Sequence, residues 1–265
     1  MSHVNENTDT SDGSSPRILV TREDPEPVSR AVRLAGGEPI ELPLLVTRWL
    51  PFRIPGGRAL DDYAWVAFTS TRALQAIAAR AGEEGWTWPP CVPAAAVGDR
   101  TADELQASGW MPECVSEEAS AQGLVECLRA RGIAGAHVLF PCSAIAESTF
   151  PDGVRAAGAV VDVVHVYTTE TVWTAEPSKK YFLARELSVA LAAGCVPTCA
   201  SPSAARALAE IAQVAGVMAG LRQRPIVVMG ETTARAVRAL GLEPVEAGGK
   251  SLALMARKAV EIGRT

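Results

Sequence analysis

Four segments of the sequence place hydroxyl side chains after a short apolar run, and three of them also contain glycine or proline. They are Thr69, Ser70 and Thr71; Gly98 and Thr101; Ser201, Pro202 and Ser203; and Gly230, Thr232 and Thr233. Serine and threonine at the start of a helix accept hydrogen bonds from its free N–H groups. Where glycine lets a ligand approach, the remaining N–H groups and the helix dipole attract an anion without a charged side chain. These turns therefore indicate a site for carboxylates or other anions.

Helix capping alone explains any one of these turns. Four such turns at matching places favour ligand binding over capping alone. The strand-to-helix turns of a parallel sheet lie at the carboxyl ends of its strands, where ligands bind. We therefore expect a polyanionic ligand that contacts several turns at once.

Three further side chains are candidates for this site. Tyr167 ends a long β-branched run, and its phenol either packs within the strand or donates a hydrogen bond to a ligand. Arg22 follows the first apolar run and either binds a carboxylate or pairs with an acid at position 23, 24 or 26. Lys250 follows two glycines and is either a ligand contact or solvated.

Other catalytic and binding motifs are missing from the sequence. It has no GxxxxGK[ST] phosphate loop, no GxGxxG between a strand and a helix, and no GxSxG turn. None of its three histidines lies beside a nucleophile or at metal-ligand spacing from a cysteine. The six cysteines include no CxxC pair, so we expect ordinary buried thiols in a reducing cytoplasm rather than disulfides or a metal centre. No cofactor is indicated.

Short apolar runs alternate with longer segments rich in alanine and leucine. The runs expected as strands are 17–21, 39–46, 65–68, 93–97, 137–140, 160–168, 225–229 and 244–246. The segments expected as helices are 27–34, 72–80, 101–108, 122–131, 147–157, 203–215, 232–240 and 252–262. Strands that alternate with helices imply crossover connections and mostly parallel sheets, which is the α/β class.

The chain also repeats itself. The spacing from Ser70 to Gly98 matches that from Ser201 to Gly230 within one residue, and the surrounding residues are similar. A weaker match relates residues 18–45 to residues 138–166. Each half therefore carries the same three units in the same order, which implies two similar α/β domains with a ligand cleft between them.

Composition excludes several classes of protein. The chain has 265 residues, enough for two domains, and its 48% hydrophobic and 21% charged residues are typical of a soluble globular protein. The net charge of −5 argues against binding nucleic acid through a basic face. No apolar run approaches the roughly 20 residues that cross a bilayer. Residues 1–16 are polar, lack the features of a signal peptide and are expected to be a disordered tail.

These motifs together resemble the uroporphyrinogen-III synthase family. The resemblance covers residues 17–262 and depends on the order and spacing of motifs that are each weak alone. The residues that carry it are 18–22 (Ile-Leu-Val-Thr-Arg), 68–70 (Phe-Thr-Ser), 96–98 (Ala-Val-Gly) with 101–102 (Thr-Ala), 166–168 (Val-Tyr-Thr), 201–204 (Ser-Pro-Ser-Ala), and Gly230 with 232–234 (Thr-Thr-Ala).

The resemblance implies two parallel-sheet α/β domains joined by a two-stranded connector, with the active site in the interdomain cleft. Residues 17–45 and 169–265 would form one discontinuous domain, and residues 46–168 the other. The extended runs 39–46 and 160–168 would be the connector strands.

The resemblance also implies an activity. Family members are hydro-lyases of tetrapyrrole and haem biosynthesis that cyclise hydroxymethylbilane, a linear tetrapyrrole with eight carboxylates, to uroporphyrinogen III. They invert the terminal pyrrole ring and need no cofactor or metal. Tyr167 would assist departure of the substrate's hydroxyl, while Arg22 and the hydroxyl and glycine turns would bind its carboxylates. Porphobilinogen deaminase would hand over the substrate, and the chain would act as a cytoplasmic monomer without nucleic-acid or membrane partners.

Two segments depart from the family's pattern. Residues 141–143 (Pro-Cys-Ser) replace a basic turn, although Ser143 is kept as a substrate contact. Pro197 interrupts an apolar strand before the turn at 199–201, so that strand should be short or lie at an edge. One alternative is a diverged protein that binds a tetrapyrrole or another anion without catalysis. A third possibility, a solute-binding protein for sugars or amino acids, is disfavoured by the turns and by the missing export signal.

Overall fold

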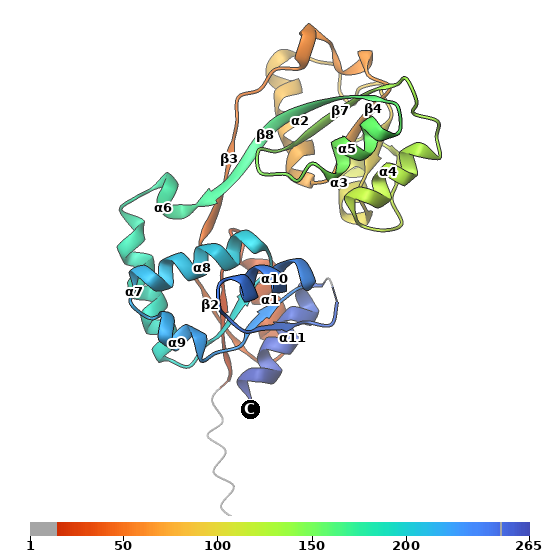
Figure 1. Cartoon of the computed structure of the whole chain (residues 1–265). Helices are drawn as coiled ribbons and strands as arrows, with labels where there is room; N and C mark the ends of the chain where they lie inside the picture. The colour runs from red at the N-terminus through yellow and green to blue at the C-terminus, as the bar shows by residue number, and fades with distance from the viewer. Residues whose placement is uncertain (1–14, 250) are drawn as a thin grey trace, which may run out of the picture. The chain divides into compact units, whose positions relative to one another are not determined.

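The computed structural model describes residues 15–249 and 251–265 (Figure 1). Within them the chain forms two compact units, which we describe separately. Unit 1 contains the described residues up to Val46 together with Glu170–Thr265, and unit 2 is Thr47–Thr169. Most of the tail expected at 1–16, and Lys250, lie outside the described residues. Pro16 is part of the fold, because its carbonyl accepts a hydrogen bond from the Glu38 amide.

Unit 1 contains a five-stranded parallel sheet. Its strands, in sheet order, are β11 (Pro244–Glu246), β10 (Ile226–Val228), β9 (Val196–Cys199), β1 (Arg17–Val20) and β2 (Glu38–Glu41). Every neighbouring pair in this order runs parallel. Parallel neighbours need crossover connections, and helices supply them.

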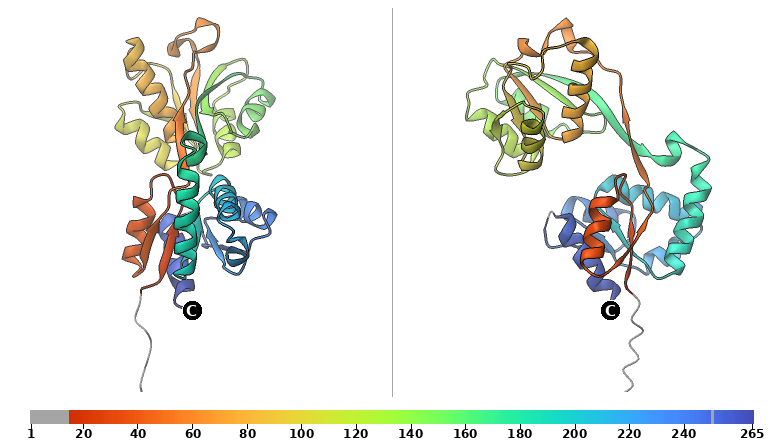
Figure 2. Two further views of the ribbon diagram at one scale, coloured as in Figure 1. Left: turned by 90° about the vertical axis from the view of Figure 1, so that its left-hand side faces the viewer. Right: turned by 180° about the vertical axis from the view of Figure 1, so that it is seen from behind.

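Helices cover both faces of this sheet (Figure 2). On one face lie α1 (Glu26–Leu34) and α11 (Leu252–Gly263); on the other lie α7 (Lys179–Ala192), α8 (Pro202–Val214) and α10 (Glu231–Ala239), with the short helices α6 (Val172–Ala175) and α9 (Met218–Arg222) in the connections. Successive strand residues point to opposite faces. Ile18 and Val20 therefore pack against the first pair of helices, while Leu19 packs against the second group.

Unit 2 contains most of a six-stranded sheet. Its strands, in sheet order, are β3 (Leu45–Trp49), β8 (Val160–Thr171), β7 (His137–Ser143), β4 (Trp65–Phe68), β5 (Ala94–Ala96) and β6 (Pro112–Val115). The strands from β8 to β6 pair in parallel. The boundary between the residue ranges of the two units falls within β3 and within β8.

The sheet of unit 2 is also covered on both faces. On one face lie α2 (Thr71–Glu84) and α3 (Asp99–Ala107), and on the other lie α4 (Ala121–Arg129) and α5 (Thr149–Ala156). Val66 and Phe68 of β4 pack against the first pair, and Ala67 packs against the second. Two short 3-10 helices, Pro55–Gly57 and Leu60–Asp62, lie between β3 and β4.

The two units share one strand order, as the sequence repeat predicts. The order β2-β1-β9-β10-β11 of unit 1 corresponds to β8-β7-β4-β5-β6 of unit 2. In each unit the chain runs outward in opposite directions from a central pair, which is β1 and β9 in unit 1 and β7 and β4 in unit 2. Sheets of this kind bind ligands at the carboxyl ends of the strands beside such a switch point.

Three predicted strands differ from the structure by more than one residue at an end, and one of them, expected at 160–168, continues as β8 to Thr171. The run expected at 39–46 is divided between β2 and β3, because Pro43 has no N–H and cannot continue a strand ladder. The strand expected at 137–140 continues as β7 to Ser143. Strand β7 pairs with β4 only as far as Leu139, but it pairs with β8 as far as Ser143. Pro141 therefore lies in a part of β7 that pairs with β8 alone, where a missing N–H can be tolerated.

Pro197 lies in β9, the central strand of unit 1, rather than at an edge. The strand is four residues long, so it is short, as expected. The Thr198 hydroxyl donates to the Leu19 carbonyl at 2.8 Å, and the Thr21 hydroxyl donates to the Thr198 carbonyl at 2.9 Å. These side-chain bonds fasten β9 to β1 beside the residue that lacks an N–H.

Helix α7 is absent from the sequence prediction. Its apolar residues do not share one face, because Tyr181, Phe182 and Val189 are exposed whereas Leu183 and Leu187 are buried. Without a clear helical period, the sequence pattern gave no signal there.

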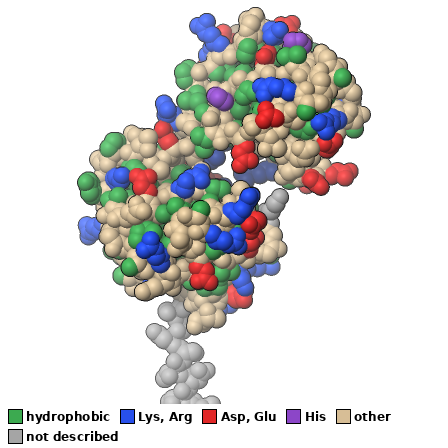
Figure 3. All heavy atoms as spheres, in the orientation of Figure 1, with side chains coloured by type: hydrophobic (Ala, Val, Ile, Leu, Met, Phe, Trp, Pro, Cys, Tyr) green, Lys and Arg blue, Asp and Glu red, His purple; other side chains and the backbone are tan. Residues whose placement is uncertain are grey.

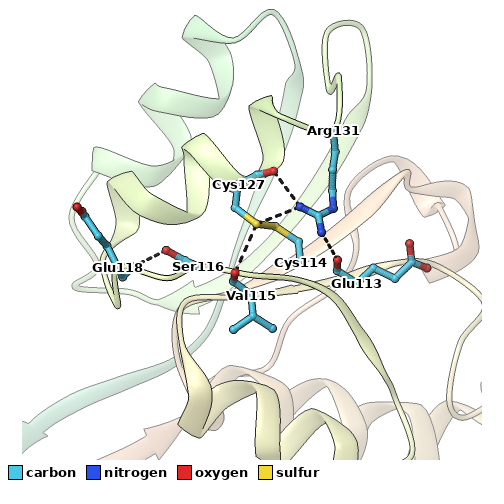
Figure 4. The surroundings of a disulfide bond; sticks show 7 residues. All are labelled: Glu113, Cys114, Val115, Ser116, Glu118, Cys127 and Arg131. Carbon is cyan, nitrogen blue, oxygen red and sulfur yellow. Dashed lines mark hydrogen bonds between the residues drawn. A yellow bond between two sulfur atoms is a disulfide. The ribbon is translucent and has the colours of Figure 1, made fainter.

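Cys114 of β6 and Cys127 of α4 form a disulfide, with the two sulfur atoms 2.00 Å apart (Figure 4). The expectation of six ordinary buried thiols is therefore wrong for this pair. The expectation is based on the absence of CxxC pairs and on chain length. Neither criterion shows that β6 and α4 pack together with these two Cα atoms 6.3 Å apart, a distance that a disulfide can span. Of the remaining cysteines, Cys91 is exposed, so the expectation is also wrong there. It is confirmed for the three buried thiols, which are Cys142, Cys195 and Cys199.

Acidic and basic side chains are interspersed over the faces that Figure 3 shows. Among the described residues, no helix is long and apolar enough to cross a membrane. The same residues include no group of His, Cys, Asp and Glu side chains that could hold a metal ion.

Candidate functional site

The switch point of unit 2 gathers three of the predicted site residues. Ser70 follows β4 and begins α2 as its N-cap residue. Ser143 ends β7, and a register shift just before it places it opposite Tyr167 of β8. The carboxyl edge of this sheet therefore carries two serines and a phenol on neighbouring strands.

Tyr167 and Ser70 are joined by a hydrogen bond. The phenol of Tyr167 donates to Ser70 Oγ, with the two oxygens 3.0 Å apart. Ser70 Oγ also accepts the Arg72 amide at 3.1 Å, which caps α2. A hydroxyl oxygen has two lone pairs and one proton. Because both lone pairs of Ser70 are engaged, its own proton is the group that remains to be donated.

The phenol of Tyr167 is firmly held. The side chain is 7% exposed, and the indole of Trp49 meets its ring edge-on with centroids 6.2 Å apart. The Tyr167 carbonyl accepts the Ala144 amide at 2.8 Å, which fixes the backbone as well. Ser70 is only half-buried. A ligand at this edge would therefore meet Ser70 before Tyr167.

Sequence reasoning missed Trp49. It ends β3, which lies beside β8 in the sheet, so its contact with Tyr167 follows from strand pairing. A tryptophan at the end of one extended run and a tyrosine at the end of another are the signal that could have found this pair.

Ser143 organises a turn rather than a helix start. Its Oγ accepts the Ile145 amide at 3.3 Å, and its carbonyl accepts the Ala146 amide at 3.0 Å. Helix α5 begins only at Thr149. Ser143 is half-buried at the end of β7, so its hydroxyl remains a candidate contact without help from a helix dipole.

The Gly98 turn offers backbone amides rather than hydroxyls. Gly98 is the N-cap of α3, and its carbonyl accepts the Thr101 amide at 3.1 Å and the Ala102 amide at 3.0 Å. The Thr101 side chain is buried, with 5% exposed. Helix geometry leaves the first amides, those of Asp99 and Arg100, without intrahelical acceptors. These two amides are the donors an anion would meet.

The Ser201 turn of unit 1 repeats the capping seen at Ser70. Ser201 Oγ accepts the Ala204 amide at 3.2 Å at the start of α8. Pro202 occupies the first turn, where its fixed φ suits the helix but its missing N–H removes one donor. Ser203 is half-buried beside it.

The Gly230 turn repeats the backbone pattern of Gly98. Gly230 is the N-cap of α10, and its carbonyl accepts the Thr233 and Ala234 amides, both at 3.0 Å. Thr233 is 5% exposed, whereas Thr232 is exposed. Thr232 is therefore the hydroxyl of this turn that a ligand can reach.

The two glycines differ in their surroundings. Among the described residues, a Cβ atom at Gly230 would meet nothing within 4 Å, whereas one at Gly98 would lie 3.2 Å from the Cβ of Ala119. Both glycines have an extended backbone that any residue adopts. Within the part of the chain that the structure describes, Gly230 therefore leaves space in front of a helix start; its contact with a ligand stays a prediction.

Arg22 follows β1 directly, at the switch point of unit 1, and is half-buried. Its contact with a ligand carboxylate stays a prediction. The predicted ligand contact of Lys250 lies outside the described residues.

A second buried phenol in unit 2 belongs to a different cluster. Tyr63 donates to Asp162 Oδ2 at 2.7 Å, and Arg58 Nη1 lies 3.1 Å from the same oxygen. Burial, reinforced by the hydrogen bond and charge of Asp162, raises the pKa of Tyr63 well above its ordinary value. Tyr63 therefore stays protonated and anchors β8, which makes it a useful control for Tyr167.

A family model described as uroporphyrinogen-III synthase HemD matches residues 26–253. The chain belongs to the uroporphyrinogen-III synthase family. A curated uroporphyrinogen-III synthase from Synechococcus elongatus is 31% identical over 159 residues, which are 57% of this chain and 59% of that relative. The match therefore spans less than two thirds of the relative's length.

Solved structures of the same family share the fold. The uroporphyrinogen-III synthetase of Helicobacter pylori 26695 aligns with a TM-score of 0.61 at 16% identity, over 93% of this chain and 99% of that one. A mutant uroporphyrinogen III synthase from the extremely thermophilic bacterium Thermus thermophilus aligns with a TM-score of 0.58 at 17% identity, over 92% and 97%. At these identities the likeness extends to the α/β fold with parallel sheets. The resemblance read from the sequence is thereby confirmed at the level of the family.

Proposed function

We propose that this protein is a uroporphyrinogen-III synthase, a hydro-lyase that cyclises hydroxymethylbilane with inversion of its terminal pyrrole ring. The observation that carries this proposal is the Tyr167–Ser70 hydrogen bond at the switch point of unit 2, in a chain of this family. A held phenol beside a reachable hydroxyl suits a reaction that begins with loss of a hydroxyl group.

Carboxylate recognition falls to the helix starts. Backbone amides that follow Gly98 and Gly230, together with the Ser201 hydroxyl, supply neutral donors at the positive ends of helix dipoles, while the single proton of Ser70 is kept for the reacting hydroxyl. The buried hydroxyls of Thr101 and Thr233 are left out of this set, because a ligand would have to displace their surroundings. We infer that one substrate contacts turns of both units. The interdomain cleft expected from the sequence stays a prediction.

The proposed chemistry starts with a proton relay. Ser70 gives its proton to the departing hydroxyl, which leaves as water, while Tyr167 passes its own proton to Ser70. The negative charge ends on the phenolate, which is far less basic than a serine alkoxide. The azafulvene cation so formed is attacked by the substituted carbon of the far pyrrole ring, which gives a spiro intermediate. After that intermediate fragments and recloses, the product ring loses a proton, and this proton restores Tyr167.

Positioning is the larger part of the task. Hydroxymethylbilane alone cyclises without inversion, so the enzyme must hold the reactive chain in one fold, and oriented reactants gain rate from that alone. Amide donors on rigid helix starts suit this role. No cofactor or metal enters the scheme.

We also propose the setting of the reaction. Porphobilinogen deaminase hands over the substrate, because free hydroxymethylbilane cyclises to the wrong isomer. The protein acts as a cytoplasmic monomer within tetrapyrrole and haem biosynthesis.

A coupled assay tests the activity. The purified protein is supplied with porphobilinogen and porphobilinogen deaminase, the products are oxidised, and type I and type III uroporphyrin are separated by chromatography. We expect mostly type III. Type I alone, from protein with a cooperative thermal unfolding transition, would contradict the proposal and favour the non-catalytic tetrapyrrole- or anion-binding alternative.

A further inference from the structure

Two of the six cysteines are placed to react with one another. Cys114 of β6 and Cys127 of α4 have Cα atoms 6.3 Å apart, within the range that a disulfide spans, and their sulfur atoms are bonded. Cys114 is fully buried, whereas Cys127 is half-buried. A reagent from solvent therefore reaches the sulfur of Cys127 first.

Arg131 places a positive charge beside that sulfur (Figure 4). Its Nη1 lies 3.2 Å from Cys127 Sγ and 3.3 Å from the Cys127 carbonyl oxygen, and its Nη2 donates to the Glu113 carbonyl. The guanidinium is thus fixed to both elements that the disulfide joins. A neighbouring cation favours the thiolate form of a cysteine, which is the nucleophilic form.

The other cysteines lack this combination of access and charge. Burial raises the pKa of Cys142 to about 11, that of Cys195 to about 11 and that of Cys199 to about 12. These three remain inert thiols near neutral pH. Cys91 is exposed and provides an internal control for access alone.

We propose that Cys114 and Cys127 form a reversible oxidation site, with a peroxide as oxidant and a dithiol as reductant. The Cys127 thiolate attacks one peroxide oxygen, the O–O bond breaks, and Cys127 becomes a sulfenic acid while hydroxide leaves and takes up a proton. The Cys114 sulfur then attacks the Cys127 sulfur, and water leaves. Two thiols have lost two electrons, and one peroxide has become two waters. Exchange with a dithiol returns both thiols and leaves the reagent as its own disulfide.

The bond controls a loop that touches the proposed substrate turn. The disulfide spans a sequence separation of 13 residues, and residues 116–120 lie within this segment. The Ser116 amide donates to the Ala96 carbonyl at 3.0 Å, and Ala119 packs against Gly98 at the start of α3. The oxidised pair holds this loop against the Gly98 turn, and reduction releases one of its attachments.

The chemical test uses the full chain and is independent of synthase activity. Protein reduced with dithiothreitol and freed of reagent is treated with hydrogen peroxide, digested without reduction and analysed by mass spectrometry. We expect a peptide that links Cys114 to Cys127, reversed by dithiothreitol and unchanged in the control Cys91→Ser. In Cys114→Ser, dimedone should trap a sulfenic acid at Cys127.

Arg131 supplies the matched pair of variants. Arg131→Gln should slow peroxide oxidation of Cys127 about tenfold, because fewer thiolates form, whereas Arg131→Lys should retain most of the rate. Oxidation should also slow amide hydrogen exchange at residues 115–120 and raise the Tm by about 5–10 °C. The proposal is overturned if peroxide yields no Cys114–Cys127 link. It is equally overturned if the link forms as fast in Arg131→Gln, or if it leaves amide exchange at residues 115–120 unchanged.

Discussion

The carboxyl edges of the two sheets are built alike and equipped differently. Ser201 in unit 1 and Ser70 in unit 2 both cap the helix that follows the strand beside the switch point. Of these two serines, only Ser70 accepts a hydrogen bond from a phenol. The Tyr167 hydroxyl donates it to Ser70 Oγ, with the two oxygens 3.0 Å apart. Tyr181, the tyrosine of unit 1, is 79% exposed on α7. The proposed anion recognition thus occurs in both units, while the phenol proposed for proton transfer lies in unit 2 alone.

The two glycine turns also differ, and here unit 1 has the more open surroundings. No described residue would contact a Cβ atom at Gly230 in unit 1, whereas Ala119 would crowd one at Gly98 in unit 2. The anion site proposed for unit 1 is therefore the roomier one, and the site proposed for unit 2 lies beside a loop that can influence it. Variants at matched positions separate recognition from chemistry.

The largest effect is expected from removing the phenol oxygen at the site. Tyr167→Phe should lower kcat for type III formation about 100-fold, because a proton donor of this kind contributes roughly that much. The matched control, Tyr63→Phe, loses a hydrogen bond to Asp162 in the same unit and should cost stability while leaving kcat nearly unchanged. Single-turnover rates and thermal melts of both variants make the measurement. Equal kcat values for the two variants would remove Tyr167 from the mechanism.

The paired serines test whether capping and chemistry coincide. Ser70→Ala and Ser201→Ala should each lose about 1 kcal/mol of unfolding free energy, since each removes a helix cap. Only Ser70→Ala should also lower kcat, by about tenfold, with a water molecule replacing part of the relay. Urea unfolding and steady-state kinetics on both proteins provide the comparison. A kcat loss of the same size in Ser201→Ala would show that the two edges share the chemistry.

The paired glycines test recognition. Gly230→Asp adds a favourable N-cap in open space, so the fold should be kept while the new carboxylate repels substrate and raises KM about fivefold. Gly98→Asp must push Ala119 aside and should lose about 1–3 kcal/mol of stability. KM values at fixed ionic strength, together with melting curves, distinguish the two. An unchanged KM in Gly230→Asp would place the substrate away from this turn.

The smallest effect concerns alkaline pH. Burial raises the pKa of Cys199 in unit 1 to about 12 and that of Cys142 in unit 2 to about 11, from 9.0. Below pH 9 both folded and unfolded states hold these protons, so stability is unaffected; above it the unfolded state releases them first, and stability falls. The Cys199→Ala variant should therefore lose less stability as the pH rises. The slope of its unfolding free energy against pH should be smaller by at most about 1.4 kcal/mol per pH unit. Urea unfolding between pH 8 and 10.5 measures this slope. An unaltered slope in Cys199→Ala would contradict the raised pKa of Cys199.

Most elements of the fold could be predicted because strand and helix periods differ and the chain repeats. Runs such as 65–68 and 244–246 match β4 and β11 residue for residue. Errors occur where a proline lies inside an extended run, as at Pro43 and Pro141, because the pattern of apolar residues does not report where a ladder ends. Helix α7 escaped prediction because its apolar residues are spread around the helix.

Only part of the candidate site could be predicted from the sequence. The turns at Ser70 and Gly230 could be found because their chemistry is local to a few residues. The Tyr167–Ser70 bond joins residues 97 apart in the sequence, and a register shift places Ser143 opposite Tyr167; no local pattern encodes either feature. The Cys114–Cys127 pair likewise depends on how α4 packs beside β6.

The discontinuity of unit 1 has a consequence for synthesis on the ribosome. The central pair of its sheet, β1 and β9, is joined by a hydrogen bond between residues 177 apart, whereas unit 2 lies wholly between these strands in sequence. Unit 2 can therefore complete its core before β9 has left the ribosome, and β1 must wait without its partner. Once folded, unit 2 shortens the loop that β1 and β9 must close, which lowers the entropic cost of that closure. The nascent chain should thus acquire its reactive phenol before its roomier anion site.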